Sequence, residues 1–204
     1  MILLVSAVAQ ELEWLGPRAG VETLVTGIGP IDAAIRVSRT LAAKRYDVVI
    51  NAGIAGAFPG VASVGDAVVV GEELYELRLE SGAPLTLPPG SLIADRVPAD
   101  SQLIEAVTSL GFPLVRGITV SRVTSTDVTA QRLRELSAEI ETMEGFAVLR
   151  AAQLANVPVI EVRGISNIVG DRESSAWDFN AGIAGLRRVL NATLDLLHTM
   201  SHAE

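Results

Sequence analysis

The stretch that decides the fold is DVVINAGIAG, residues 47–56. The aliphatic run Val48 to Ile50 predicts a strand buried on both faces of a parallel sheet, because such strands read as continuous apolar runs. The small residues that follow, Asn51 to Gly56, predict a loop whose backbone N–H groups can approach a bound molecule. A purely structural turn fits this loop about as well as a ligand site.

Apolar runs of strand length alternate with segments of helical period on both sides of this stretch. The expected strands cover residues 2–8, 21–26, 65–70, 114–121 and 157–163, and the expected helices cover 10–15, 31–43, 99–110, 129–137, 144–155 and 178–200. Residues 72–98, rich in Pro and Gly, are expected to form loops with an edge hairpin. The pattern predicts one α/β domain over residues 1–204, with an ordered core to about 198 and a short C-terminal tail.

The composition excludes several classes of protein. The 204 residues carry a net charge of -8 with only 16 Lys and Arg and no basic run, which argues against nucleic acid as a partner. There is no cysteine, and both His lie in the C-terminal tail, so we expect no metal site and no thiol chemistry. The apolar start, residues 2–9, is too short to span a membrane, and we expect a cytoplasmic protein without a membrane partner.

The first glycine loop, residues 26–32, reads TGIGPID. It begins like a dinucleotide-binding fingerprint, but Asp32 stands where the third glycine would be and Pro30 occupies the turn. No Walker A pattern occurs in the sequence. We therefore expect a tight turn into a helix, and no cofactor.

Carboxylates in apolar surroundings are informative, because burial of such a group is costly unless it is paired or used. Glu11 follows the first strand, and Glu144 precedes a helix; a solvated acid in a first helical turn is the alternative for each. The polar cluster at residues 163–172 follows the strand at 157–163, and a loop held by local hydrogen bonds is its alternative. Trp177 lies beyond it and can also serve core or subunit packing.

Taken together and in this order, these motifs resemble the purine nucleoside phosphorylase and nucleosidase family, in its nucleosidase branch. The resemblance covers nearly the whole chain. Each motif is weak alone, whereas six in one order are specific. They are Glu11, TGIG at 26–29, NAGIAG at 51–56, VGDAVV at 64–69, TMEG at 142–145 and VRGISN at 162–167.

The resemblance implies a three-layer α/β/α sandwich around a mixed, mostly parallel twisted sheet, and cleavage of a purine N-glycosidic bond without a metal. It implies that Glu11 activates the attacking water, that Met143 and Glu144 bind the ribose, and that Asn167 holds the base at N7 and its six-substituent. A homodimer or higher homo-oligomer is implied as well. The further substrate-binding residues expected are Gly53, Ile54, Ala55, Thr142, Phe146, Arg163, Ser166, Arg172 and Trp177.

Position 167 bears on the choice of substrate. A carboxylate facing the 6-oxo group of hypoxanthine would put two acceptors together, whereas the amide of Asn167 can donate to O6 and accept from a protonated N7. The segment 165–172 followed by Trp177 is similar to futalosine hydrolases, which release hypoxanthine from futalosine in menaquinone biosynthesis. Arg172 and residues 74–89 are candidates for binding the carboxyphenyl part of that substrate.

The sequence departs from methylthioadenosine nucleosidases at three positions. Ile54 stands where a serine is common, and Thr142 where a glutamate is common. The aromatic residue that stacks on the base would fall near Ser125, which leaves Phe146 and Trp177 as candidates for that contact.

Three other functions stay open on the sequence. One is an adenine-releasing 5'-methylthioadenosine/S-adenosylhomocysteine nucleosidase, and another is a purine nucleoside phosphorylase. A non-catalytic binding protein of the same fold is the third, although pure binding has no need for a water-activating base such as Glu11.

Overall fold

The computed structural model describes residues 1–89, 91–171 and 176–201. The strands are β1 (Ile2–Ser6), β2 (Val21–Val25), β3 (Val48–Ala57), β4 (Ala67–Tyr75), β5 (Arg96–Pro98), β6 (Leu114–Thr119), β7 (Ile140–Thr142) and β8 (Val159–Ile168). The helices are α1 (Pro30–Ala43), α2 (Ser101–Thr108), α3 (Asp127–Glu135), α4 (Gly145–Leu154) and α5 (Phe179–Ser201), with a short 3-10 helix, η1 (Ala9–Glu11).

The described strands form one mixed sheet in the order β2-β1-β3-β7-β6-β4-β5, and β8 pairs with both β3 and β4. The pairs β1–β2, β1–β3, β3–β8, β4–β6 and β6–β7 are parallel, while β3–β7, β4–β5 and β4–β8 are antiparallel. The α/β class and the mixed sheet expected from the sequence are thus confirmed.

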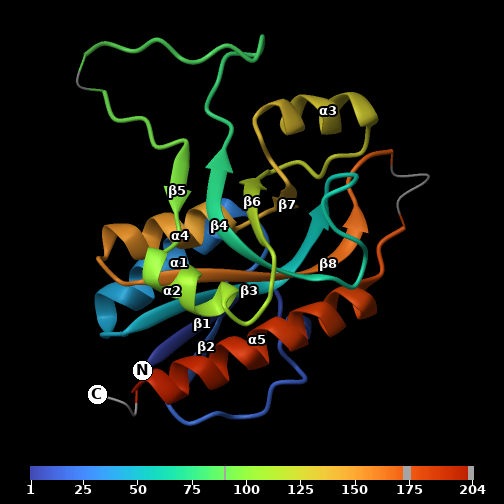
Figure 1. Cartoon of the computed structure of the whole chain (residues 1–204). Helices are drawn as coiled ribbons and strands as arrows, with labels where there is room; N and C mark the ends of the chain where they lie inside the picture. Colours follow the sequence, from blue (N-terminus) through green and yellow to red (C-terminus); the bar gives the residue numbers. More distant parts are fainter. Residues whose placement is uncertain (90, 172–175, 202–204) are drawn as a thin grey trace.

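Part of this sheet closes on itself, which the sequence did not indicate. Strands β3, β8, β4, β6 and β7 each pair with the next, and β7 pairs again with β3. Register shifts between Ala55 and Gly56 and between Val70 and Glu72 let long strands bend and change partner. The result is a five-stranded ring with β1 and β2 extending from β3 (Figure 1).

Two segments expected as loops are continuous strand. Residues 51–56 belong to β3 and residues 163–167 to β8, where Gly53 pairs with Arg163 and Gly56 with Asn167. The local turn signal of the small residues is overridden, because parallel pairing between β3 and β8 satisfies the backbone of both. The expectation of loops there was therefore wrong, and the polar side chains of these segments project from strands.

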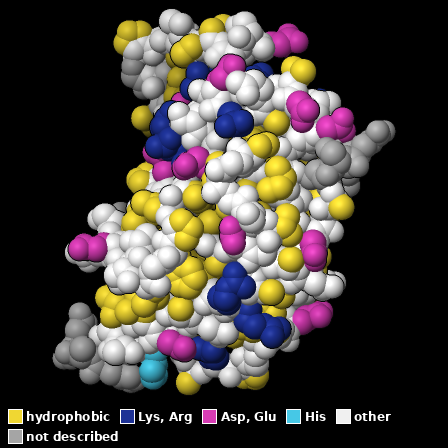
Figure 2. Space-filling model, turned by 45° about the vertical axis from the view of Figure 1, so that its right-hand side comes forward, with side chains coloured by type: hydrophobic (Ala, Val, Ile, Leu, Met, Phe, Trp, Pro, Cys, Tyr) yellow, Lys and Arg dark blue, Asp and Glu magenta, His cyan; other side chains and the backbone are white. Residues whose placement is uncertain are grey.

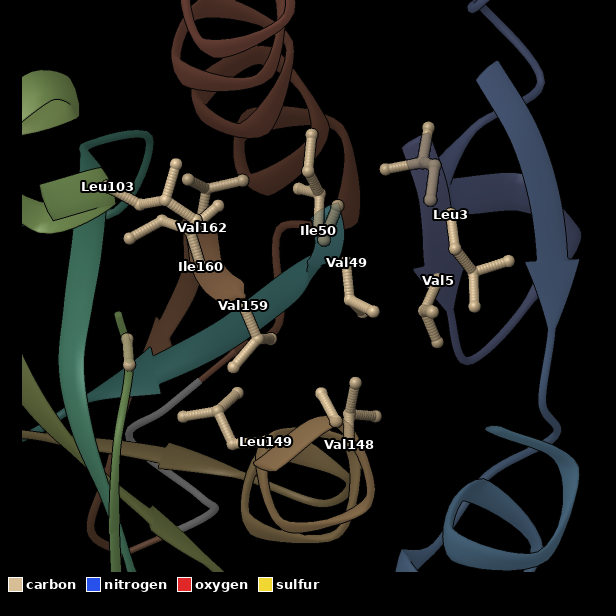
Figure 3. Close-up of a cluster of buried hydrophobic side chains, with 14 of the residues drawn as sticks. Leu3, Val5, Val49, Ile50, Leu103, Val148, Leu149, Val159, Ile160 and Val162 are labelled. Atoms are coloured by element: carbon tan, nitrogen blue, oxygen red, sulfur yellow. The ribbon is translucent and has the colours of Figure 1, made fainter. Parts of the chain in front are cut away.

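Helices cover both faces of the paired strands β3 and β8. In Figure 3, Val148 and Leu149 of α4 face Val49 and Val159, whereas Ile50 points to the opposite side, toward α5. Alternate residues of a strand point to opposite faces, so the continuous aliphatic runs of β3 and β8 fill two layers of core. Burial of each such side chain stabilises the fold by about 1.5–3 kcal/mol.

The surface is mixed in character. On the face drawn in Figure 2, acidic and basic side chains are scattered among hydrophobic ones. Across the described residues, no helix is both long and apolar enough to cross a bilayer. Residues 76–89 and 91–95, between β4 and β5, extend away from the ring (Figure 1).

Candidate active site

A cavity of about 190 Å³ gathers most of the residues singled out by the sequence. It lies where the ends of η1, β3, β7 and β8 and the start of α5 meet. Its walls include three carboxyl groups and one amide, together with hydroxyl and apolar side chains. The lining residues are Ala7, Val8, Glu11, Ile28, Ile54, Ala55, Gly56, Val123, Glu141, Thr142, Met143, Glu144, Ser166, Asn167, Trp177 and Phe179.

Within the part of the chain that the structure describes, the hydrogen bonds to the Glu11 side chain come from backbone N–H groups. Its Oε2 accepts from the N–H of Ala7 at 3.0 Å and of Val8 at 3.2 Å, which lie just before it in the chain. Its Oε1 accepts from the N–H of Ile54 at 2.9 Å. The side chain is 3% exposed, and its position is fixed from two elements, η1 and β3. A buried acceptor fixed in this way is suited to accept a proton from water at one defined place.

Arg163 lies behind Glu11, in the wall of the cavity but not at its surface. Its Nε donates to Glu161 at 2.8 Å, and both side chains are buried. Burial opposes the charge of Arg163, but the carboxyl groups of Glu161, Glu144 and Glu11 outweigh it and raise the pKa of the guanidinium. Arg163 is therefore a buried positive charge that interacts electrostatically with both Glu144 and Glu11.

Gly53 leaves the space in which the side chains of Glu11 and Arg163 approach each other. A Cβ at this position would lie 2.7 Å from Glu11 Oε1 and even closer to a guanidinium nitrogen of Arg163. The glycine in β3 is thus required by a close approach of side chains and not by a turn.

Glu144 stands at the N-terminus of α4 and is 6% exposed. Its Oε1 accepts from the N–H of Gly29 at 2.7 Å, so the first glycine loop serves to hold this carboxyl group. Burial raises the pKa of Glu144 above that of an ordinary glutamate, while the charge of Arg163 and the hydrogen bond from Gly29 act to lower it. Gly29 adopts a φ of 104°, which favours glycine.

Asn167 is oriented by its neighbour. The hydroxyl of Ser166 lies 2.9 Å from Asn167 Oδ1, to which it can donate, and it lies 3.2 Å from the carbonyl oxygen of Ala55. A Cβ at Gly56 would stand 2.9 Å from Asn167 Nδ2, so this glycine makes room for the amide. With Oδ1 accepting from Ser166, the Nδ2 group is available as a donor in the cavity.

The aromatic edge of the cavity comes from the start of α5. The N–H of Asp178 donates to the carbonyl of Ser166 at 2.8 Å, which ties this segment to β8. On either side of it, Trp177 is 49% exposed and Phe179 is 37% exposed. Both rings line the cavity. Half-exposed rings beside a polar cavity can cover a planar ligand.

Not every expected residue reaches the cavity. Phe146 does not line it but stacks on Tyr75, with ring centroids 5.2 Å apart, and residues 74–89 do not line it either. Ser125 is also absent from the wall, where Val123 stands instead. Arg172 lies outside the described residues.

Two residues that line the cavity, the polar Glu141 and the aromatic Phe179, were not predicted from the sequence. Glu141 accepts from the N–H of Thr124 at 3.1 Å and from its hydroxyl, and burial raises its pKa. Glu141 lies one residue before the TMEG motif, and this closeness was the sequence feature that could have indicated it. Phe179 had no signal beyond its closeness to Trp177.

The described part of the chain holds no group of three or more His, Cys, Asp or Glu arranged to bind a metal ion. The described residues that line the cavity include no Lys, Arg or His. What the cavity presents is buried carboxyl groups and an oriented amide, a donor set for proton transfer and for binding hydroxyl groups.

Sequence comparison matches residues 19–200 to the model of the phosphorylase superfamily. A futalosine hydrolase from Thermus thermophilus is 34% identical over 192 residues, which cover 90% of this chain and 85% of that protein. A futalosine hydrolase from Streptomyces coelicolor is 35% identical over 187 residues, covering 82% of this chain and 75% of the relative.

Structural comparison agrees on the fold. A futalosine hydrolase of Helicobacter pylori superposes with a TM-score of 0.80 at 17% identity, covering 95% of this chain and 97% of the other. A 5'-methylthioadenosine/S-adenosylhomocysteine nucleosidase from Neisseria meningitidis, solved with methylthio-immucillin-A, also gives 0.80, at 18% identity with the same coverage. With the sequence relatives, these matches show that the chain belongs to the phosphorylase superfamily and, within it, to the futalosine hydrolase family.

Proposed function

We propose that this protein hydrolyses the N-glycosidic bond of futalosine, releasing hypoxanthine and dehypoxanthine futalosine, as a step of menaquinone biosynthesis. The observation that carries the proposal is the cavity in which Glu11, Glu144 and Asn167 meet. The names of the sequence relatives support the choice of futalosine among purine nucleosides.

The proposed reaction uses water as the nucleophile. The bond between C1' and the purine breaks with its electron pair leaving on the base, and the sugar becomes oxocarbenium-like. Glu11 takes a proton from the attacking water while the water oxygen bonds to C1'. The three backbone hydrogen bonds to Glu11 hold its carboxyl group in place for this step. The negative charge of Glu11 and Glu144 favours the cationic sugar.

The leaving base is held by Asn167. Its Nδ2 donates to O6 of hypoxanthine. Its Oδ1, which has a second lone pair beside the bond from Ser166, accepts from the N–H that N7 gains by taking a proton from solvent water. Relief of negative charge on the base lowers the barrier to bond cleavage. Met143 and Glu144 bind the ribose, Trp177 and Phe179 cover the substrate, and Arg163 stabilises the two glutamates from behind.

Water is favoured over phosphate by the charge of the cavity. Three carboxyl groups, those of Glu11, Glu141 and Glu144, line it. A phosphate site needs convergent cations or donors, and a dianion placed among carboxylates is repelled. This supports hydrolysis in place of phosphorolysis.

The test is an assay of free base release. The protein is incubated with futalosine, inosine and 5'-methylthioadenosine, with and without phosphate, and the products are separated by chromatography. We expect hypoxanthine from futalosine at a rate that phosphate does not change. Adenine release faster than hypoxanthine release would overturn the substrate, and dependence on phosphate would overturn hydrolysis.

The remaining expectations are proposals of the same kind. One nucleosidase domain over residues 1–204, layered as an α/β/α sandwich, is supported by α4 and α5 packing on opposite faces of β3 and β8. A homo-oligomer is supported by exposed apolar residues on and before α1, where Ile31 is 75% exposed and Ile28, which lines the cavity, is 64% exposed. A cytoplasmic location fits a pathway of small metabolites.

A further inference from the structure

One buried carboxyl group has no part in the proposed chemistry. Glu73 lies in β4, is 0% exposed and does not line the cavity. Burial, and then the nearby Glu161, raise the pKa of Glu73 well above its ordinary value. Because a buried carboxyl group is costly, its surroundings indicate what it does.

Two threonine hydroxyls donate hydrogen bonds to Glu73. Thr119 Oγ1 donates to Glu73 Oε2 at 2.7 Å, and Thr142 Oγ1 donates to Oε1 at 3.0 Å. The same oxygen of Thr119 accepts from the N–H of Phe146 at 2.7 Å. Glu73 is thereby linked to residue 142 directly and to residue 146 through Thr119.

These two links enclose Met143 and Glu144. Thr142 is the last residue of β7, and Phe146 lies in the first turn of α4. The segment 142–146 is thus tied at both ends to one side chain, and the carboxyl group of Glu144 projects from its middle toward Gly29.

Two glycines complete the cradle of Glu73. A Cβ at Gly117 would lie 2.6 Å from Glu73 Cδ, and a Cβ at Gly145 would lie 2.8 Å from its Cγ. Gly145 directly follows Glu144, so the backbone beside Glu144 packs on the Glu73 side chain. A larger residue at either place would push the carboxyl group away from the two threonines.

We propose that Glu73 is a positioning residue that sets the place of Glu144 against the ribose hydroxyls. This inference rests on the proposed function, in which Glu144 binds the ribose. A displacement of about 1 Å at a site of this kind costs as much as about a hundredfold in rate, so a rigid support of Glu144 matters to catalysis.

The test compares Glu73→Ala with Glu73→Gln, which keeps the shape and can still bond to both threonines. Futalosine and its 2'-deoxy analogue are the substrates, since the analogue lacks one hydroxyl that Glu144 would bind. We expect Glu73→Ala to lower the ratio of kcat/KM for futalosine over the analogue by about tenfold or more. Glu73→Gln should keep the wild-type ratio within about twofold.

If Glu73 served general stability alone, Glu73→Ala would lower kcat/KM equally for both substrates and leave their ratio unchanged. That result overturns the proposal. Glu72→Ala is the matched control, because it removes the partly exposed carboxyl group next in β4 and its ion pairs with Arg96 and Arg116. If Glu73→Ala does not fold, Thr119→Val removes the hydroxyl between Glu73 and Phe146 while keeping the side-chain shape. It is expected to lower the ratio in the same direction.

Hydrogen exchange separates this inference from the proposed function. Without substrate, the peptide covering residues 142–149 should exchange faster in Glu73→Ala and Thr119→Val than in the wild type and in Glu73→Gln. Unchanged exchange in both variants overturns the positioning role. If the wild type cleaves no nucleoside but exchange rises as expected, the proposed function fails and the link from Glu73 to Glu144 stands.

Discussion

The backbone N–H of Ile54 donates to Glu11 Oε1 at 2.9 Å and so joins β3 to the carboxyl group that follows β1. This bond fixes the proposed general base from a second strand. The role of Glu11 in water activation can be separated from its role in the structure by an isosteric substitution.

Glu11→Gln is expected to lower kcat by about a hundredfold to ten-thousandfold, because an amide cannot take the proton of water. The KM for futalosine should change much less. Initial rates of hypoxanthine release measure both. Glu13→Gln, two residues on at an exposed position, is the control and should behave as the wild type. Wild-type turnover by Glu11→Gln would remove Glu11 as the base.

Gly53→Ala is expected to impair activity more than stability. The new methyl would displace the side-chain ends of Glu11 and Arg163, which are more easily moved than backbone. We expect kcat/KM to fall about tenfold or more, with a small loss in Tm. Gly16→Ala is the control, since nothing lies within 4 Å of its new methyl. Full activity of Gly53→Ala would contradict the close packing of these two groups.

Asn167→Asp should weaken cleavage of the 6-oxopurine by about 1–3 kcal/mol in transition-state binding, because an acceptor would replace the donor to O6. The measured quantity is the ratio of kcat/KM for futalosine over 5'-methylthioadenosine, which we expect to fall. Asn180→Asp, an exposed change at the start of α5, should leave it unaltered. An unchanged ratio in Asn167→Asp would rule out discrimination by this amide.

Glu73→Gln is expected to change how stability depends on pH. Since burial raises the pKa of Glu73 above its ordinary 4.5, the unfolded chain loses this proton at lower pH than the folded one. Glu73 therefore supports the folded state fully below pH 4.5, and this support is lost as the pH rises through the raised pKa. Relative to the wild type, the free energy of unfolding of the Gln variant should therefore rise as the pH is raised from 4.5 to 8.

Denaturant unfolding at a series of pH values measures this difference. Glu13→Gln, which replaces an exposed carboxyl group, should give a curve parallel to that of the wild type. If the curve of Glu73→Gln is also parallel to that of the wild type, protonation of Glu73 does not contribute to the stability of the folded state.

The starts of β3 and β8 could be predicted, because burial on both faces leaves a continuous aliphatic run such as Val48 to Ile50. The second halves of β3 and β8 could not, since Gly53 and Gly56 give a local turn signal that only pairing overrides. Strand β7 is three residues long and has no pattern of its own.

The site divides in the same way. Glu11 and Glu144 could be found as carboxyl groups in apolar surroundings, and Asn167 as part of a polar cluster after an apolar strand, while their roles came from the family resemblance. Glu141 and Phe179 owe their places in the wall to contacts with elements distant in the chain, namely the loop at Thr124 and the end of β8. No spacing within the sequence encodes such contacts.

Closure of the five-stranded ring bears on the order in which helix content and activity are recovered during refolding. The pair β3–β7 joins Gly56 and Ala57 to Glu141 and Ile140, which are far apart in sequence, and contacts of this kind form slowly. The segment carrying Glu144 directly follows β7, so we expect it to take its place together with this pair. Helix content can form before such non-local pairs, so we expect activity to recover later than helix content in a refolding experiment.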